Sequence, residues 1–172
     1  MQLTADKQFL DQIQGIRDRV FRVAKRILIS KEEAEDATQE VILKLWNMEE
    51  SKRKSFNNLE AYTITMAKNH CLDRIKSKQA QVLSLNEQFQ SQPSPSLQKQ
   101  IEVSNEMEWV AKLIDQLPER ERMILQLREI EQYEFDQIAS LMEIPEGTVR
   151  VYLSRIRKKI KKQFIEIQSH GI

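Results

Sequence analysis

Residues 134–163, EFDQIASLMEIPEGTVRVYLSRIRKKIKKQ, contain two apolar helical patterns separated by a short turn. The first pattern consists of Phe135, Ile138, Ala139 and Met142, which follow the spacing of one helix face. The turn falls at 143–145, and Gly147 with Thr148 opens a longer helix. This order predicts a helix-turn-helix.

The longer helix has one apolar and one basic face. Its apolar positions are Val149, Leu153, Ile156, Ile160 and Phe164. From Arg150 to Lys162 there are seven cations and no acid, whereas 119–146 holds eight acids and three cations, so the net charge of +1 hides a dipolar segment. A basic second helix suits a DNA major groove. The alternatives are a solvated basic helix and a helix lying on anionic lipid. The short preceding helix and the small Ala139 favour DNA.

The composition predicts an all-α protein, because 3 Gly and 4 Pro in 172 residues supply few turns for sheets. One cysteine and two histidines are too few for a closed zinc site, so we expect no metal and no cofactor. Cys71 is expected in the core. The N-terminal residues have no basic leader and no long apolar run, which predicts a cytoplasmic protein.

Two helical blocks and a linker are predicted, at 1–78, 79–104 and 105–172. In the first block, apolar positions recur at helical steps from Phe9 to Ile27, from Ala34 to Leu45 and from Ile64 to Ile75. Ser30 and Asn57 are the expected N-caps of the second and third of these helices. The segment 47–56, NMEESKRKSF, lacks periodicity and is expected to be a loop.

The flexible linker is predicted from composition. Residues 79–100 hold 7 Gln, 4 Ser and 2 Pro, types that seldom build a core. A flexible chain of that length allows the two blocks to act at separate sites on one partner.

Three segments together resemble the extracytoplasmic-function (ECF) sigma factors of the bacterial sigma-70 family. They are AEDATQEVILKLW (34–46), NLEAYTITMAKNHCLDRIK (58–76) and LPERERMILQLREIEQYEFDQIASLMEIPEGTVRVYLSRIRKKI (117–160). The resemblance implies a first domain, region 2, that binds core RNA polymerase (beta and beta-prime subunits) and opens the minus 10 promoter element. It implies a second domain, region 4, that binds the minus 35 element by its helix-turn-helix.

The resemblance also implies site residues. Its polymerase-binding pattern falls on Asp36, Gln39 and Glu40, which without the resemblance would suit an ordinary solvated face. Its strand-opening surface corresponds to 47–56 and to a helix bearing Lys68, Asn69, Asp73, Arg74 and Lys76. Trp46 and Tyr62 occupy positions where relatives have aromatics, and we expect both mainly in the core.

The minus 35 residues predicted on the second helix of the helix-turn-helix are Thr148, Arg150, Val151, Ser154, Arg155, Arg157, Lys158 and Lys161. Arg150 and Ser154 lie where base edges are met, unless Arg150 pairs with Glu146 one turn away. Glu143 stands where relatives have Gly, so either it is left-handed or the turn is altered. Val151 replaces a small polar residue of relatives, so the minus 35 sequence read here is expected to differ.

The function expected from these features is that of a promoter-specificity subunit of RNA polymerase, without enzymatic activity or a small-molecule substrate. Its partners are then core polymerase, promoter DNA and an anti-sigma factor of the membrane-attached kind common in the family. The alternative is a stand-alone helix-turn-helix regulator that binds duplex DNA as a dimer.

Overall fold

The computed structural model describes residues 2–88 and 106–170, and every regular element in these ranges is helical. The first block comprises α1 (Gln2–Leu28), α2 (Lys31–Asn47), α3 (Glu50–Ser55) and α4 (Leu59–Gln88). The second block comprises α5 (Glu106–Asp115), α6 (Glu119–Leu125), the π-helical segment η1 (Gln126–Ile130), α7 (Phe135–Met142) and α8 (Glu146–His170). The all-α prediction is confirmed.

The core of the first block lies between α1, α2 and α4, along the apolar stripes expected from the sequence. Its buried residues are Ile16, Val20, Val23, Ile27, Ala34, Ala37, Val41, Leu45, Ile64, Ala67 and Cys71. The Ser30 hydroxyl accepts a hydrogen bond from the Glu33 N–H at 3.3 Å, as a helix N-cap does. The cap of α4 is Asn58 rather than Asn57, since its Oδ1 accepts from the Ala61 N–H at 3.0 Å.

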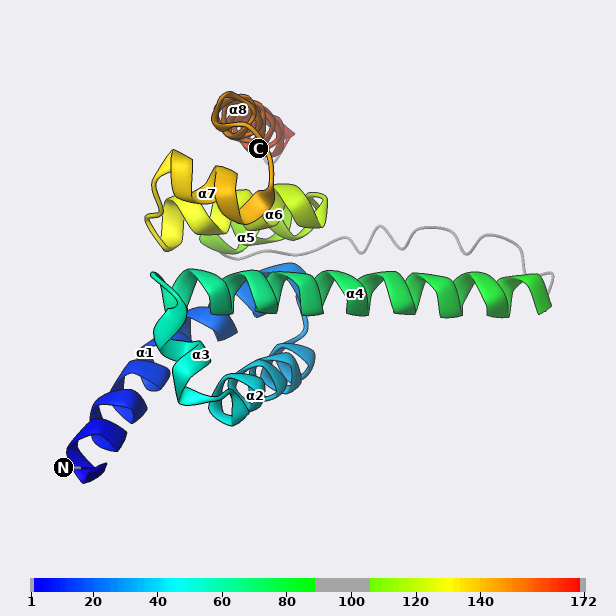
Figure 1. Ribbon diagram of the computed structural model, residues 1–172. Helices are drawn as coiled ribbons and strands as arrows, with labels where there is room; N and C mark the ends of the chain where they lie inside the picture. Colours follow the sequence, from blue (N-terminus) through cyan, green and yellow to red (C-terminus); the bar gives the residue numbers. More distant parts are fainter. Residues whose placement is uncertain (1, 89–105, 171–172) are drawn as a thin grey trace.

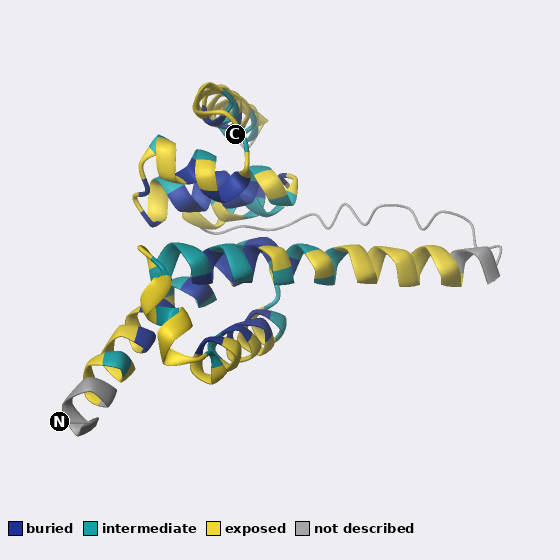
Figure 2. Ribbon diagram, viewed as in Figure 1, coloured by how far each residue is buried: buried dark blue, intermediate teal, exposed yellow. Residues whose placement is uncertain are grey.

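Two expected non-helical segments contain helix. The segment 47–56 was predicted as a loop, but α3 occupies six of its residues, and an ion pair from Glu50 to Lys54 at 2.6 Å spans one turn. The predicted linker begins too early, because α4 continues from 79 to Gln88 without Gly or Pro to stop it. This end of α4 projects from the body (Figure 1), and its residues 79–85 are exposed (Figure 2). The rest of the linker, 89–104, lies outside the described residues.

The second block packs against the first (Figure 1). Its own core includes Leu117, Met123, Ile124, Leu127, Ile138, Val149, Leu153 and Ile156. Helix α6 and segment η1 contact α1, and α7 contacts α4. Most buried apolar residues of both blocks form one continuous cluster, so the described parts of the two blocks are a single packed body.

Candidate nucleic-acid interface

The helix-turn-helix is formed by α7, the residues 143–145 and α8. Glu143 adopts the left-handed conformation, with φ of 55° and ψ of 43°. The N–H groups of Glu143 and Ile144 donate to the carbonyls of Ser140 and Ala139, at 3.4 and 3.1 Å, which closes the end of α7 as a Schellman motif. The turn is therefore not altered. Glu143 takes the left-handed conformation, which costs a non-glycine residue about 1 to 2 kcal/mol of conformational energy.

Helix α8 divides its faces as the sequence predicts. Val149, Leu153 and Ile156 are buried against the rest of the second block. The predicted minus 35 residues are exposed, except for half-buried Thr148, whose N–H donates to the Pro145 carbonyl at 3.0 Å. The exposed ones are Arg150, Val151, Ser154, Arg155, Arg157, Lys158 and Lys161. Seven of the eight predicted residues therefore share one accessible surface of α8.

Two arginines of this surface are held within the protein. Arg150 donates to the Glu146 carboxylate at 2.9 Å and lies over the Phe135 ring, at 4.2 Å from the ring centroid. Arg157 donates from Nε to the Glu129 carboxylate at 3.1 Å. Among the residues that the structure describes, no such partner is found for Ser154, Arg155, Lys158 or Lys161. The free donors therefore lie along the middle of α8.

The minus 10 residues predicted on α4 are not all accessible. Asn69, Asp73 and Lys76 are exposed. Lys68 is only 6% exposed, and its Nζ donates to the Leu141 carbonyl of α7 at 2.6 Å. Burial lowers the pKa of its ammonium group. Arg74 donates to the Glu33 carbonyl of α2 at 2.9 Å. In this arrangement Lys68 is covered by the second block, so its predicted DNA contact is not available, and Arg74 joins two helices.

The predicted polymerase-binding residues lie together on the outer face of α2. Asp36, Gln39 and Glu40 are all exposed. The Glu40 carboxylate lies 3.1 Å from Nε2 of His70 on α4. These residues stand off the buried stripe of α2, so a partner can reach their side chains without unpacking the core.

A cleft with aromatic side chains lies between α1, α3 and the start of α4. The sequence pattern predicted only part of it. Trp46 was expected in the core, but it is 49% exposed and stacks on Phe9 with ring centroids 5.8 Å apart. Tyr62 is half-buried and stacks on Phe56 at 4.0 Å. The Arg53 guanidinium lies 3.9 Å from the Phe9 ring centroid. Phe9, Arg53 and Phe56 line a cleft of about 520 Å³.

The contribution of α1 to this cleft was missed. Phe9 continues the apolar stripe of α1 by helical spacing, so the sequence assigned it to the core. The available signal was the cation-rich segment 52–54, because Arg and Lys side chains are attracted to the faces of aromatic rings.

Within 2–88 and 106–170, no group of three or more His, Cys, Asp and Glu side chains is arranged to hold a metal ion. Cys71 is buried, and burial raises the pKa of its thiol to about 12, as expected for a core cysteine. None of the described helices is both long and apolar enough to cross a membrane.

A helix-turn-helix with an accessible basic helix is typical of DNA-binding proteins that act in transcription. Two family models match the chain in order: Sigma-70 region 2 on residues 13–81 and Sigma-70, region 4, on residues 107–160. Together they include every site residue discussed above except Phe9 and Lys161.

Whole-chain relatives agree with these matches. The RNA polymerase sigma-H factor of Pseudomonas aeruginosa is 28% identical over 84% of this chain and 79% of its own length. The ECF RNA polymerase sigma factor SigW of Bacillus subtilis is 25% identical, over 92% of this chain and 90% of its own. The ECF RNA polymerase sigma factor SigL of Mycobacterium tuberculosis is 24% identical, over 89% of this chain and 85% of its own length.

A solved structure shares the fold. The sigma factor RpoE of Bartonella quintana, solved in complex with the anti-sigma factor NepR, superposes with a TM-score of 0.68 over 94% of this chain and 98% of that chain, at 17% identity. The chain therefore belongs to the ECF branch of the sigma-70 family and is an RNA polymerase sigma factor. Sigma-70 proteins are non-enzymatic factors of transcription initiation. Matches to both regions favour this function over the stand-alone regulator.

Proposed function

We propose that the two blocks divide the work of promoter recognition. The first block, predicted at 1–78 and matched as region 2, binds core polymerase and opens the minus 10 element. The second block, predicted at 105–172 and matched as region 4, binds the minus 35 element through α8. The observation that carries this proposal is the accessible basic face of α8, opposite its buried face.

Minus 35 recognition is assigned to the outer face of α8. Ser154 and Arg155 read base edges, because both are exposed and free of other described partners, and Arg forks onto guanine. Lys158 and Lys161 lie farther along the helix and meet phosphates. Thr148 and Val151 face the groove at the start of the helix. Arg150 and Arg157 contact DNA only if they break their hydrogen bonds to Glu146 and Glu129, respectively.

Core binding is assigned to Asp36, Gln39 and Glu40. Carboxylate and amide groups on one exposed helix face suit a partner surface rich in Arg and Lys, since charge-assisted hydrogen bonds are the stronger ones. The beta and beta-prime subunits of core polymerase are the proposed partner.

Minus 10 opening is assigned to Asn69, Asp73 and Lys76 together with the aromatic cleft. An unstacked base is stabilised by an aromatic face, and nearby cations hold the separated phosphates. Arg53 and Phe56 supply both kinds of group in that cleft. Strand opening requires no bond-making step, so we propose that the chain has no enzymatic activity and uses no cofactor or small-molecule substrate.

Regulation is assigned to a partner protein, and the chain is proposed to act in the cytoplasm. The Bartonella RpoE structure contains an anti-sigma factor bound to a chain of the same fold. By this likeness we propose an anti-sigma partner for this protein, of the membrane-attached kind common in the family.

Permanganate footprinting of promoter DNA with and without core polymerase tests the proposed function. The chain alone is expected to bind duplex weakly and to open no bases, since two weak modules become effective only when a scaffold fixes their spacing. Reactive thymines at the minus 10 element are expected when core is added. The proposed function would be contradicted if the isolated chain opened the DNA. It would also be contradicted if core polymerase with the chain opened no selected promoter.

A further inference from the structure

Two cations cross between the blocks, and each one caps a helix of the other block. Arg122 of α6 donates to the carbonyls of Arg26 and Ile27, at 3.0 and 2.7 Å, in the last turn of α1. Lys68 of α4 donates to the carbonyl of Leu141, in the last turn of α7. The last carbonyls of a helix have no partner within the helix and carry partial negative charge. Each block therefore completes the end of a helix in the other.

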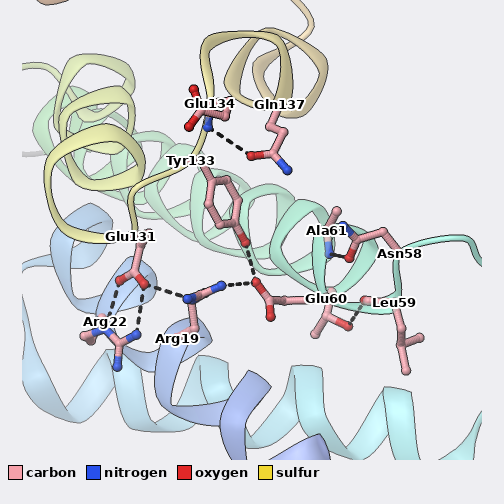
Figure 3. Close-up of polar contacts among 11 residues, drawn as sticks. Arg19, Arg22, Asn58, Leu59, Glu60, Ala61, Glu131, Tyr133, Glu134 and Gln137 are labelled. Atoms are coloured by element: carbon pink, nitrogen blue, oxygen red, sulfur yellow. Dashed lines mark hydrogen bonds and ion pairs between the residues drawn. The ribbon is translucent and has the colours of Figure 1, made fainter.

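Glu131 supplies the ionic part of the same contact. It follows η1 in the second block, and its side chain is 1% exposed. Both of its carboxylate oxygens accept from Arg22 of α1 at 2.9 Å, and Nε of Arg19 lies 3.0 Å away (Figure 3). A buried carboxylate is costly unless it is paired in this way. Gln126 of the second block also donates to it at 3.2 Å, but its cationic partners lie in the first block.

A second polar chain extends this contact toward α4. The Tyr133 hydroxyl donates to the Glu60 carboxylate at 2.7 Å, and Arg19 bonds the same carboxylate (Figure 3). Burial and the negative charge of Glu60 raise the pKa of Tyr133, which keeps its hydroxyl a donor. Arg19 therefore joins Glu60 and Glu131, one from each block.

We propose that this chain closes on itself without a partner, and that the closed contact is an autoinhibitory device. Its components are the Glu131 ion pairs and the reciprocal caps by Arg122 and Lys68. The closed form uses Lys68, a residue of the predicted minus 10 surface, to cap the first helix of the helix-turn-helix. Promoter opening then requires the blocks to separate and release Lys68. This last link depends on the proposed function, whereas closure of the free chain does not.

Single-molecule energy transfer on the full chain tests the closure. Dyes are attached at Ser77→Cys on α4 and Lys159→Cys on α8, both exposed positions. Buried Cys71 stays unlabelled because its thiol pKa is raised to about 12. The free protein is expected to show one narrow high-transfer population. Glu131→Gln is expected to raise the ratio of open to closed molecules on the order of tenfold or more, because it leaves the Arg22 and Arg19 contacts without a charge.

Two further variants keep the test decisive. Arg22→Gln removes the same ion pair from the other block, where Arg22 is half-exposed, and is expected to open the chain without affecting the second block's fold. Glu129→Gln is the control, because Glu129 pairs with Arg157 inside the second block. A free protein that is already open, or Arg22→Gln indistinguishable from Glu129→Gln, would overturn the proposal.

Core polymerase separates this proposal from the proposed function. Adding core to the labelled wild-type protein is expected to move the population to low transfer. Suppose that the free chain is closed and Arg22→Gln opens it, but core polymerase leaves the energy transfer unchanged. The closed contact is then confirmed, and its proposed role in promoter opening fails.

Discussion

The guanidinium carbon of Arg150 in α8 lies 4.2 Å from the centroid of the Phe135 ring in α7, which ties the two helices of the helix-turn-helix together. The same side chain bonds Glu146 one turn earlier. Of the two roles considered for Arg150, base reading and support of α8, the contacts favour support. The distinction leads to a prediction about promoter choice.

Arg150→Ala is expected to cost about 1 kcal/mol of unfolding free energy, from one helix-surface ion pair and one exposed cation–π contact. It is expected to leave minus 35 sequence preference intact. Arg155→Ala is expected to relax preference at one or two positions and to cost about 1 to 3 kcal/mol in binding. Selection of randomised minus 35 sequences with holoenzyme measures both. A changed sequence logo for Arg150→Ala, with an unchanged one for Arg155→Ala, would reverse the assignment.

Lys161→Ala is expected to weaken binding to all minus 35 sequences alike. Lys161 is an exposed ammonium group beyond the base-reading part of α8, and loss of one phosphate contact lowers the slope of log affinity against log salt by about 1. Holoenzyme binding measured across a salt series gives the slope. Sequence-dependent loss with an unchanged slope would argue for a base contact instead.

Charge reversal at Asp36 and Glu40 to Lys is expected to lower affinity for core polymerase while the first block stays folded. Both side chains are exposed and lie off the buried stripe of α2. Glu32→Lys, on an exposed position near the start of α2, is the matched control. Core affinity is measured by fluorescence titration and folding by circular dichroism. Equal core affinity for the double variant and the control would exclude this surface.

Glu143→Gly is expected to stabilise the protein by about 0.5 to 1 kcal/mol. Glycine removes the cost of the left-handed conformation at φ of 55°, but it also increases the freedom of the unfolded chain, which reduces the gain. Glu143→Ala keeps the Cβ atom and is expected to give no gain. Urea unfolding of the three proteins compares them. Equal stability of the Gly and Ala variants would show that the turn is not strained.

The closed arrangement is expected to weaken in acid. Burial alone would raise the pKa of Glu131, but hydrogen bonds from Arg22 and Gln126 and the charges of Arg22 and Arg19 outweigh it and lower the pKa below 4.5. A carboxylate with a lowered pKa stabilises the closed form above its ordinary pKa, and this stabilisation is lost as pH falls through the lowered value.

The measurement is the closed fraction from energy transfer across that acidic range. Glu60 and Tyr133 also lie in the contact, so the wild type is compared with Glu131→Gln at each pH. The wild type is expected to lose closed molecules more steeply below about pH 4.5 than the variant. Parallel curves for the two proteins would assign the acid response to other carboxylates.

Local patterns in the sequence determined most of the fold. Helical spacing located the buried faces of α1, α2 and α8, because side-chain periodicity depends only on the backbone geometry of the helix itself. The helix-turn-helix followed from the same spacing, whereas the left-handed option at Glu143 came from the resemblance to sigma factors, which have Gly at that position. Composition was a weaker guide, since Gln-rich residues 79–88 form helix where no Gly or Pro interrupts them.

Only the tertiary structure decided how the two blocks meet. Glu131 with Arg22, and Lys68 with Leu141, are 109 and 73 residues apart, and no local pattern records such pairings. The burial of Lys68 and the exposure of Trp46 reversed expectations because exposure depends on which distant surface covers a helix face. Arg150 shows the same principle at shorter range. Its position on α8 is periodic, but its contact with Phe135 exists only because the turn at Glu143 brings α7 alongside.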